Sequence, residues 1–198
     1  MKILHIDSAT TGENSVSREL TKAAVEHFTA KHPDAQVTTL DFDTDPLPHL
    51  TAATTGAIRL PAEAHTPEMA AAFPTERAVL DQFLASDIVI LGVPMYNFTV
   101  PSSIKAWLDR LGVPGVTFSY SEAGPKGLAG GRRVIVVSSR GGEYEFDGPM
   151  EHQETFLRDM FGFIGIDDVE FIRAEKIGYG PDVRAAAIAD AKAEIAKL

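Results

Sequence analysis

The stretch DIVILGV at residues 87–93 decides the fold class, because it is a nearly continuous apolar run without polar alternation. Such a run is typical of a parallel strand buried on both faces of a sheet. RVIVVS at residues 133–138 has the same character, and KILHID at 2–7 is a short apolar run that ends in a polar residue. At residues 36–42 apolar and polar side chains alternate, as in a strand near a sheet edge. With a last strand at 169–174, the sequence predicts five strands.

Helices are predicted between these strands. Their ranges are 15–31, 67–86 with an interruption near Pro74, 101–111, a fourth helix around 157–164 that ends at Gly162 or Gly165, and 181–198. Five strands that alternate with five helices predict an α/β doubly wound parallel sheet. No linker or repeat divides the chain, so residues 1–198 are expected to form one domain. The irregular stretch 43–66 is either a functional lid or binding loop, or a surface excursion.

The composition excludes several classes of function. Among the 198 residues there is no Cys, which removes disulfides, thiol nucleophiles and iron–sulfur clusters. The net charge is -10 and Lys and Arg are not concentrated anywhere, so we expect no nucleic-acid partner. The six His form no helical pair, and we expect no metal site. No apolar run reaches bilayer length, and the N-terminus begins directly with a strand pattern, so we expect no membrane association and a cytoplasmic location.

Three loops follow the first, third and fourth strands, and parallel strands bring such loops to one sheet edge. The first, residues 8–18, delivers Ser15 and Ser17 to a helix N-terminus with Arg18 behind them. Hydroxyls, free N–H groups and the helix dipole make a phosphate seat there. The alternative, that Ser15 only caps the helix, is equally compatible with the local sequence.

The other two loops suit a flat ligand. Residues 94–101, PMYNFTVP, place Met95, Tyr96, Asn97 and Phe98 directly after a buried strand, where they can either line an aromatic ligand or pack as an ordinary turn. Residues 139–144, SRGGEY, contain paired glycines, which bring backbone N–H groups close to an acceptor or simply make a turn. All three loops on one edge indicate FMN bound in a flavodoxin-like fold.

The chain resembles the FMN-dependent NADH azoreductase / NADH:quinone oxidoreductase family over nearly its whole length. The resemblance is carried by the sequences SVS at 15–17, PMYNF at 94–98, GVTFSY at 115–120, GPKGL at 124–128, SSRGG at 138–142, GFIGI at 162–166 and YGP at 179–181. It implies a homodimer with one FMN per subunit near the interface. By position, the phosphate contacts are Ser15, Val16 and Ser17, the flavin is lined by Met95, Tyr96, Asn97 and Phe98, and its pyrimidine end meets Ser139, Arg140, Gly141 and Gly142.

The chain departs from the family pattern at two positions. Ala9 stands where relatives commonly have a flavin-contacting serine, so Ser8 is the candidate for that contact, with Thr10 or a backbone N–H as alternatives. Tyr144 follows the paired glycines where relatives often carry His. The resemblance also suggests substrate contacts at Arg59, Tyr120, Phe163 and Tyr144, with Tyr120 and Phe163 coming from either subunit.

The resemblance implies an enzyme in which NADH or NADPH reduces the flavin and a quinone or azo compound then reoxidises it in a ping-pong sequence. The cofactor carries this chemistry, so no catalytic side chain is expected. One rival is a one-electron carrier of the flavodoxin kind, against which the long stretch 43–66 argues. A second rival is a receiver domain phosphorylated on aspartate, but Asp7 stands alone and the third strand ends in GVP.

Overall fold

The computed structural model describes all residues 1–198 and contains the predicted five-stranded parallel sheet. The strands are β1 (Lys2–Asp7), β2 (Gln36–Asp41), β3 (Ile88–Gly92), β6 (Arg133–Ser139) and β7 (Val169–Ala174), in the order β2-β1-β3-β6-β7. All four neighbouring pairs are parallel. β3 and the last six residues of β6 are buried, whereas β2 lies at an edge and is largely exposed. The fold class predicted from the sequence is confirmed.

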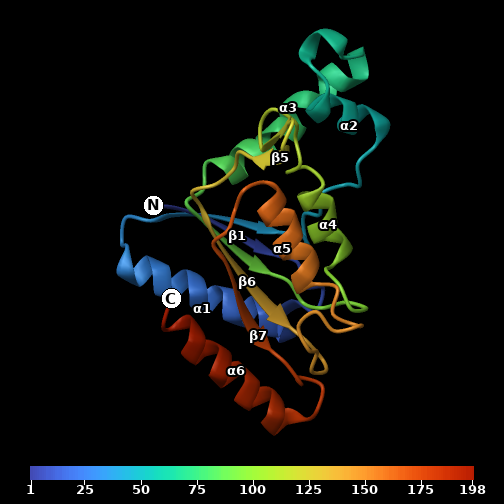
Figure 1. The fold of residues 1–198 in the computed structure, drawn as a ribbon. Coiled ribbons are helices and arrows are strands. Elements are labelled where there is room, and N and C mark those ends of the chain that lie inside the picture. Colours follow the sequence, from blue (N-terminus) through green and yellow to red (C-terminus); the bar gives the residue numbers. More distant parts are fainter.

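Helices cover both faces of the sheet (Figure 1). On one face, α1 (Val16–Lys31) and α6 (Pro181–Ile195) pack against an apolar cluster that includes Ile90 and Val137. The opposite face carries α3 (Pro67–Leu84), α4 (Ser102–Leu108) and α5 (Glu154–Phe163) around a larger cluster that includes Trp107. Alternate side chains of one strand therefore enter two separate cores, which explains the continuous apolar runs.

The stretch 43–66 is not structureless, which corrects the expectation of an irregular loop. It contains α2 (Ala52–Arg59) and the short 3-10 turn Ala62–Ala64. A capping box formed by Thr51 and Thr54 starts α2, because each side chain accepts a hydrogen bond from the other residue's backbone N–H. This segment and the beginning of α3 project beyond the body of the molecule (Figure 1).

The predicted interruption near Pro74 is also wrong, since α3 runs through that residue. A proline inside a helix removes one hydrogen bond to the carbonyl four residues earlier, here Ala70. Both residues are exposed, so the freed carbonyl can bond water. α3 can therefore continue through the proline.

A small antiparallel hairpin, β4 (Phe118–Ser121) with β5 (Gly124–Gly127), was not expected from the sequence. It lies against the end of α5, where the chain turns at Gly165 with φ +90°. A Cβ added to Gly127 would lie only 2.1 Å from the backbone nitrogen of Gly165, so only glycine fits at residue 127. The hairpin therefore stays close to the C-terminal end of α5.

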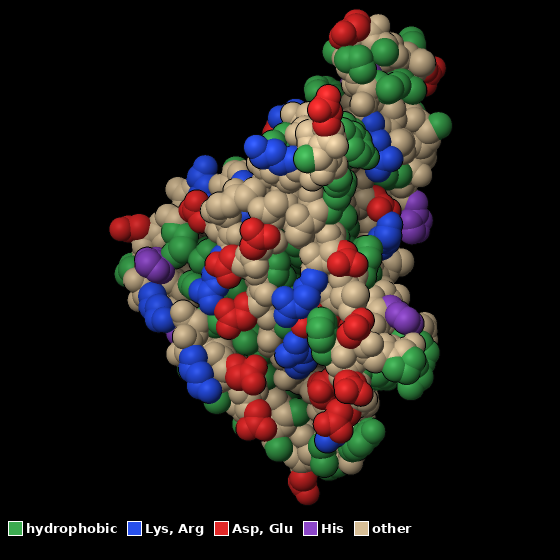
Figure 2. Space-filling model, viewed as in Figure 1, with side chains coloured by type: hydrophobic (Ala, Val, Ile, Leu, Met, Phe, Trp, Pro, Cys, Tyr) green, Lys and Arg blue, Asp and Glu red, His purple; other side chains and the backbone are tan.

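The topology brings the three candidate loops together, because β1, β3 and β6 are adjacent. The chain leaves β1 toward β2 on one side and returns to β3 on the other, which makes the β1/β3 boundary the switch point where such sheets bind ligands. None of the helices has the length and apolar character needed to cross a bilayer. On the face shown in Figure 2, basic side chains are scattered among acidic ones.

Candidate functional site

The N-terminus of α1 has free donors for an anion. Ser15 is the N-cap, and its hydroxyl accepts from the backbone N–H of Arg18 at 3.2 Å, so the capping role is real. The hydroxyls of Ser15 and Ser17 lie 3.1 Å apart. The N–H groups of Val16 and Ser17 have no hydrogen-bond partner, as expected for the first turn of a helix. Two hydroxyls and two free amides at the positive end of α1 can hold a phosphate.

Arg18 does not face this seat, although its place in the sequence suggested that it would support a phosphate site. Its guanidinium forms two hydrogen bonds to Asp41, at 2.7 and 2.5 Å, and also reaches the carbonyl of Ala9 at 2.9 Å. The pairing lowers the pKa of Asp41 below its usual value, because the hydrogen bonds from Arg18 favour the charged carboxylate. Arg18 therefore joins β2 to the first loop and is already neutralised by carboxylates.

Backbone and side-chain bonds tie the first loop to the second. The hydroxyl of Ser8 is buried and donates to the carbonyl of Gly92 at 2.6 Å, so its proton is already in use. The phenol oxygen of Tyr96 lies 3.1 Å from the N–H of Thr10, which donates to it. The two loops thus meet directly above the switch point.

The second loop makes a tight turn of unusual conformation. Tyr96 and Thr99 exchange backbone hydrogen bonds, and between them Asn97 and Phe98 have φ values of +49° and +74°. Asn tolerates the left-handed region, but a bulky residue such as Phe adopts it at a cost. Phe98 nevertheless has 43% of its surface exposed, so burial does not repay that cost. Strain of this kind is often found where a side chain is held for a ligand.

The third loop presents backbone donors. The carbonyls of Gly141 and Gly142 accept from the N–H groups of Gly178 and Lys176, at 3.1 and 2.8 Å. The N–H groups of Gly141, Gly142 and Glu143 have no partner within the protein. A Cβ placed on Gly141 would meet no atom within 4 Å, so open space adjoins this backbone. These amides can bond the polar edge of a ring.

Arg140 does not use its side chain in this cradle. The guanidinium is buried and bonds Glu151 at 3.0 Å and Glu175 at 3.3 Å. Its backbone N–H and carbonyl are also engaged, with Ala174 and Ile177. Arg140 therefore supports the loop from beneath, and Ser139 accepts a hydrogen bond from the N–H of Met95 at 2.9 Å.

Tyr144 belongs to the same edge. Its ring meets that of Phe98 edge-to-face with centroids 6.2 Å apart, and its backbone N–H donates to Glu175 at 3.2 Å. The second and third loops thus share an aromatic contact. The structure places Tyr144 beside the flavin-lining candidates.

Arg59, Tyr120 and Phe163 come together elsewhere, around a cavity of about 360 Å3. Phe118 packs between the two aromatic residues, with centroid distances of 5.3 Å to Tyr120 and 4.5 Å to Phe163. Arg59, at the end of α2, donates to the carbonyl of Asp109 at 3.4 Å. α5 begins beside the third loop and rises about 1.5 Å per residue, so Phe163 lies roughly 14 Å along its axis from Glu154. Within one chain this group is separate from the three loops.

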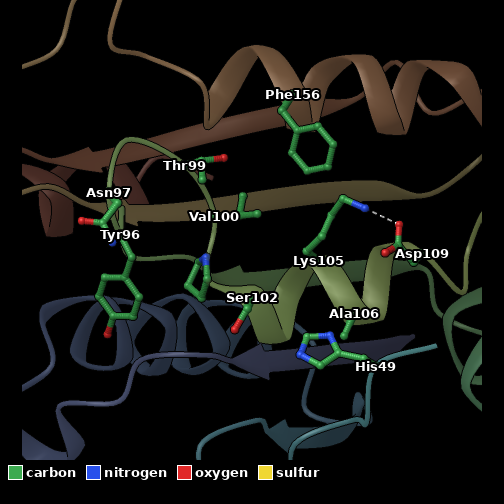
Figure 3. A pocket seen from close by; sticks show the side chains of 11 residues that line it. His49, Tyr96, Asn97, Thr99, Val100, Ser102, Lys105, Ala106, Asp109 and Phe156 are labelled. Carbon is green, nitrogen blue, oxygen red and sulfur yellow. Dashed lines mark hydrogen bonds and ion pairs between the residues drawn. The ribbon is translucent and has the colours of Figure 1, made fainter. Parts of the chain in front are cut away.

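A cavity of about 610 Å3 adjoins the second loop and was not foreseen (Figure 3). Beside Tyr96 and Asn97 it is lined by His49, Lys105 and Phe156, with Lys105 pairing with Asp109 at 2.5 Å. The i, i+4 spacing of Lys105 and Asp109 signals a helical ion pair, but no sequence pattern places His49 or Phe156 beside them. No group of three His, Asp or Glu side chains is arranged to hold a metal ion.

A doubly wound sheet with an anion seat and a donor-lined loop at its switch point defines a nucleotide-binding protein of the flavodoxin-like class. A family model described as "Flavodoxin-like fold" matches residues 1–198. A protein of Rhizobium meliloti (strain 1021), "FMN-dependent NADH:quinone oxidoreductase", is 51% identical over 201 residues, covering 100% of this chain and 96% of the relative. One of Xanthomonas axonopodis pv. citri (strain 306), "FMN-dependent NADH:quinone oxidoreductase 1", is 48% identical over 197 residues, with coverages of 100% and 96%.

Among solved structures, an azoreductase from Bacillus anthracis str. Sterne matches with a TM-score of 0.89 and 29% identity, covering 100% of this chain and 97% of that one. The chain therefore belongs to the flavodoxin-like-fold family that includes the FMN-dependent NADH:quinone oxidoreductases. The family resemblance expected from the sequence is confirmed.

Proposed function

We propose that this protein is an FMN-dependent oxidoreductase that transfers two electrons from NADH or NADPH to quinones and also cleaves aromatic azo compounds. The proposal rests on two sets of backbone N–H groups that have no hydrogen-bond partner and lie at opposite edges of one site. Val16 and Ser17 offer free N–H groups at one edge, and Gly141, Gly142 and Glu143 do so at the other. The names of the Rhizobium and Xanthomonas relatives support the same cofactor and reaction.

The residues present fit FMN. The seat at Ser15–Ser17 suits its phosphate, the strained turn at Asn97 and Phe98 suits the ring, and the amides at 141–143 suit the pyrimidine edge. When bound, FMN would supply the hydride-transfer chemistry between the nicotinamide and the acceptor, for which we propose a ping-pong order. The amides stabilise negative charge that develops at the pyrimidine edge, because they are fixed before it forms. The cavity beside Asn97 gives flat substrates room next to the ring.

We propose further that residues 1–198 act as one domain and that two copies form the working enzyme. The aromatic group around Tyr120 and Phe163 lies at the opposite end of α5 from the three loops. Tyr120 is three-quarters exposed, which leaves it available to a second subunit. A partner that presents this group, with Arg59, over the ring would complete a hydrophobic wall that one chain lacks.

The rivals raised by the sequence fit less well. A receiver domain needs an aspartate at the end of the third strand and clustered acids after the first. β3 ends at Gly92, and Asp7 is buried, bonded by Thr21 at 2.8 Å and 3.7 Å from Arg18. A one-electron carrier needs no substrate cavity beside its cofactor, yet about 610 Å3 adjoins Asn97.

Steady-state kinetics test the reaction order. Initial rates are measured at several NADH concentrations against a quinone, with FMN-loaded protein. A ping-pong enzyme gives parallel double-reciprocal lines. Intersecting lines would refute the proposed order, and absence of turnover with both NADH and NADPH would refute the function.

A further inference from the structure

The buried side chain of Gln153 lies at the point where β3 and β6 separate into the two loops. It is fully buried at the N-cap of α5. Its Nε2 donates to the carbonyl of Val93 at 3.0 Å, and its Oε1 accepts from the hydroxyl of Ser138 at 2.6 Å. Val93 follows β3 directly, and Ser138 is the second-last residue of β6. One amide therefore bridges the starts of both loops.

The hydrogen bonds around Gln153 run in one direction. A guanidinium only donates, and Nε of Arg140 donates to Oγ of Ser138 at 3.0 Å. The Ser138 hydroxyl then donates to Gln153, which in turn donates to Val93, whose carbonyl can only accept. Only an uncharged side chain that both accepts and donates completes this chain. Asn would be one methylene too short, and an ionised Glu cannot donate.

The residues next to Gln153 hold the same two loops. The N–H of His152 donates to the carbonyl of Phe98 at 3.0 Å, and the hydroxyl of Thr99 donates to the carbonyl of His152 at 3.1 Å. Glu151 accepts from Arg140, just before the paired glycines, and from the N–H of Gln153. Segment 151–153 thus contacts both the strained turn at Asn97 and Phe98 and, through Arg140, the third loop.

We propose that Gln153 is a positioning residue that sets the separation between the second and third loops, and through it the fit of the flavin ring. This inference rests on the proposed function. Gln153 does not contact the ring itself, but its amide fixes the carbonyl of Val93 relative to Ser138. Loss of the amide leaves the Val93 carbonyl without a donor and the Ser138 hydroxyl without an acceptor, so the two loops are held together less firmly.

The test compares Gln153→Met and Gln153→Glu with a control, Ile195→Ala. Met matches the length of Gln without hydrogen bonds, and Glu keeps the acceptor, which protects the test if the Met variant folds poorly. Ile195 is buried against the opposite face of the sheet, so its truncation lowers stability without touching either loop. The readouts are the FMN dissociation constant, the visible circular dichroism of bound FMN, and hydrogen exchange of residues 93–101 and 139–146 in the apoprotein.

The inference predicts that both Gln153 variants weaken FMN binding about 10- to 100-fold, the range seen when the partners that orient metal ligands are removed. They also change the dichroism of bound FMN and speed exchange in both loops, whereas Ile195→Ala only lowers the thermal midpoint. Dissociation constants within twofold of wild type, or faster exchange in one loop alone, would overturn it. If wild-type protein takes up no FMN, the proposed function fails, while exchange in the apoprotein still decides whether Gln153 couples the loops.

Discussion

Replacing Arg140 by Met tests whether the third loop, residues 139–144, depends for its stability on the buried ion pair between Arg140 and Glu151. The Arg140 side chain is 1% exposed, and it is the only guanidinium within reach of Glu151, which is equally buried. Glu151 would keep only backbone donors at the start of α5, the N–H groups of Gln153, Glu154 and Thr155. Breaking a buried pair by removing one partner costs about 3–5 kcal/mol. For a chain of this size that corresponds to a fall of about 6–20 °C in thermal midpoint.

The assay is urea unfolding of the apoprotein, monitored by far-UV circular dichroism. Glu151→Gln in the Arg140→Met background removes the uncompensated charge and keeps an acceptor oxygen for the N–H groups of Gln153 and Glu154. We therefore expect the double variant to be more stable than Arg140→Met alone. A loss below about 1 kcal/mol in the single variant, or simple additivity in the double, would refute the reasoning.

Three further predictions concern the loops and the acid limit of stability. Gly141→Ala should leave unfolding stability nearly unchanged but weaken FMN binding, because its Cβ enters only open space where the ring would lie. Isothermal titration compares its FMN affinity with that of the control Gly162→Ala, whose Cβ is also unobstructed, and equal affinities of the two variants would contradict the proposed ring site. Phe98→Asn should raise the free energy of unfolding by about 0.5–1 kcal/mol, since Asn tolerates φ +74°, and should reduce FMN affinity. Denaturant titration measures the change in stability, and a variant destabilised by more than about 1 kcal/mol would contradict backbone strain at Phe98. The Asp41 pKa is lower in the folded state, so the folded protein binds fewer protons and this contribution, complete above about pH 5, is lost as pH falls through the lowered pKa. Asp41→Asn should flatten the fall in thermal midpoint below pH 4, and an unchanged slope would exclude the Arg18 pairing as its cause.

The strands were predictable because their local sequence and their burial agree. Residues 87–93 and 133–138 are apolar at nearly every position, and in the structure both of their faces enter cores. By contrast, α2 begins at a pair of threonines whose side chains bond each other's backbone, in a segment rich in proline and alanine. Its apolar periodicity is too short to signal a helix. The capping pattern, Thr followed by Thr three residues later, was its only clue.

The site was predictable as a set of loops but not as a set of roles. The backbone N–H groups of Val16, Ser17, Gly141 and Gly142 are free, in the two loops where the sequence predicted an anion seat and a donor-rich turn. Whether an arginine beside such a loop faces the ligand depends on distant carboxylates. Arg18 turns to Asp41 on a neighbouring strand, and Arg140 turns to Glu151 beneath the loop. Pairings across such distances in the chain leave no pattern in a single sequence.

The visible absorbance spectrum tests the proposed function most directly. Protein loaded with FMN is titrated with NADH without oxygen, and then with one equivalent of a quinone. The proposal predicts flavin bands that bleach on NADH and return in full with one quinone per flavin. A protein that takes up no FMN, or a flavin that NADH does not bleach, would contradict it.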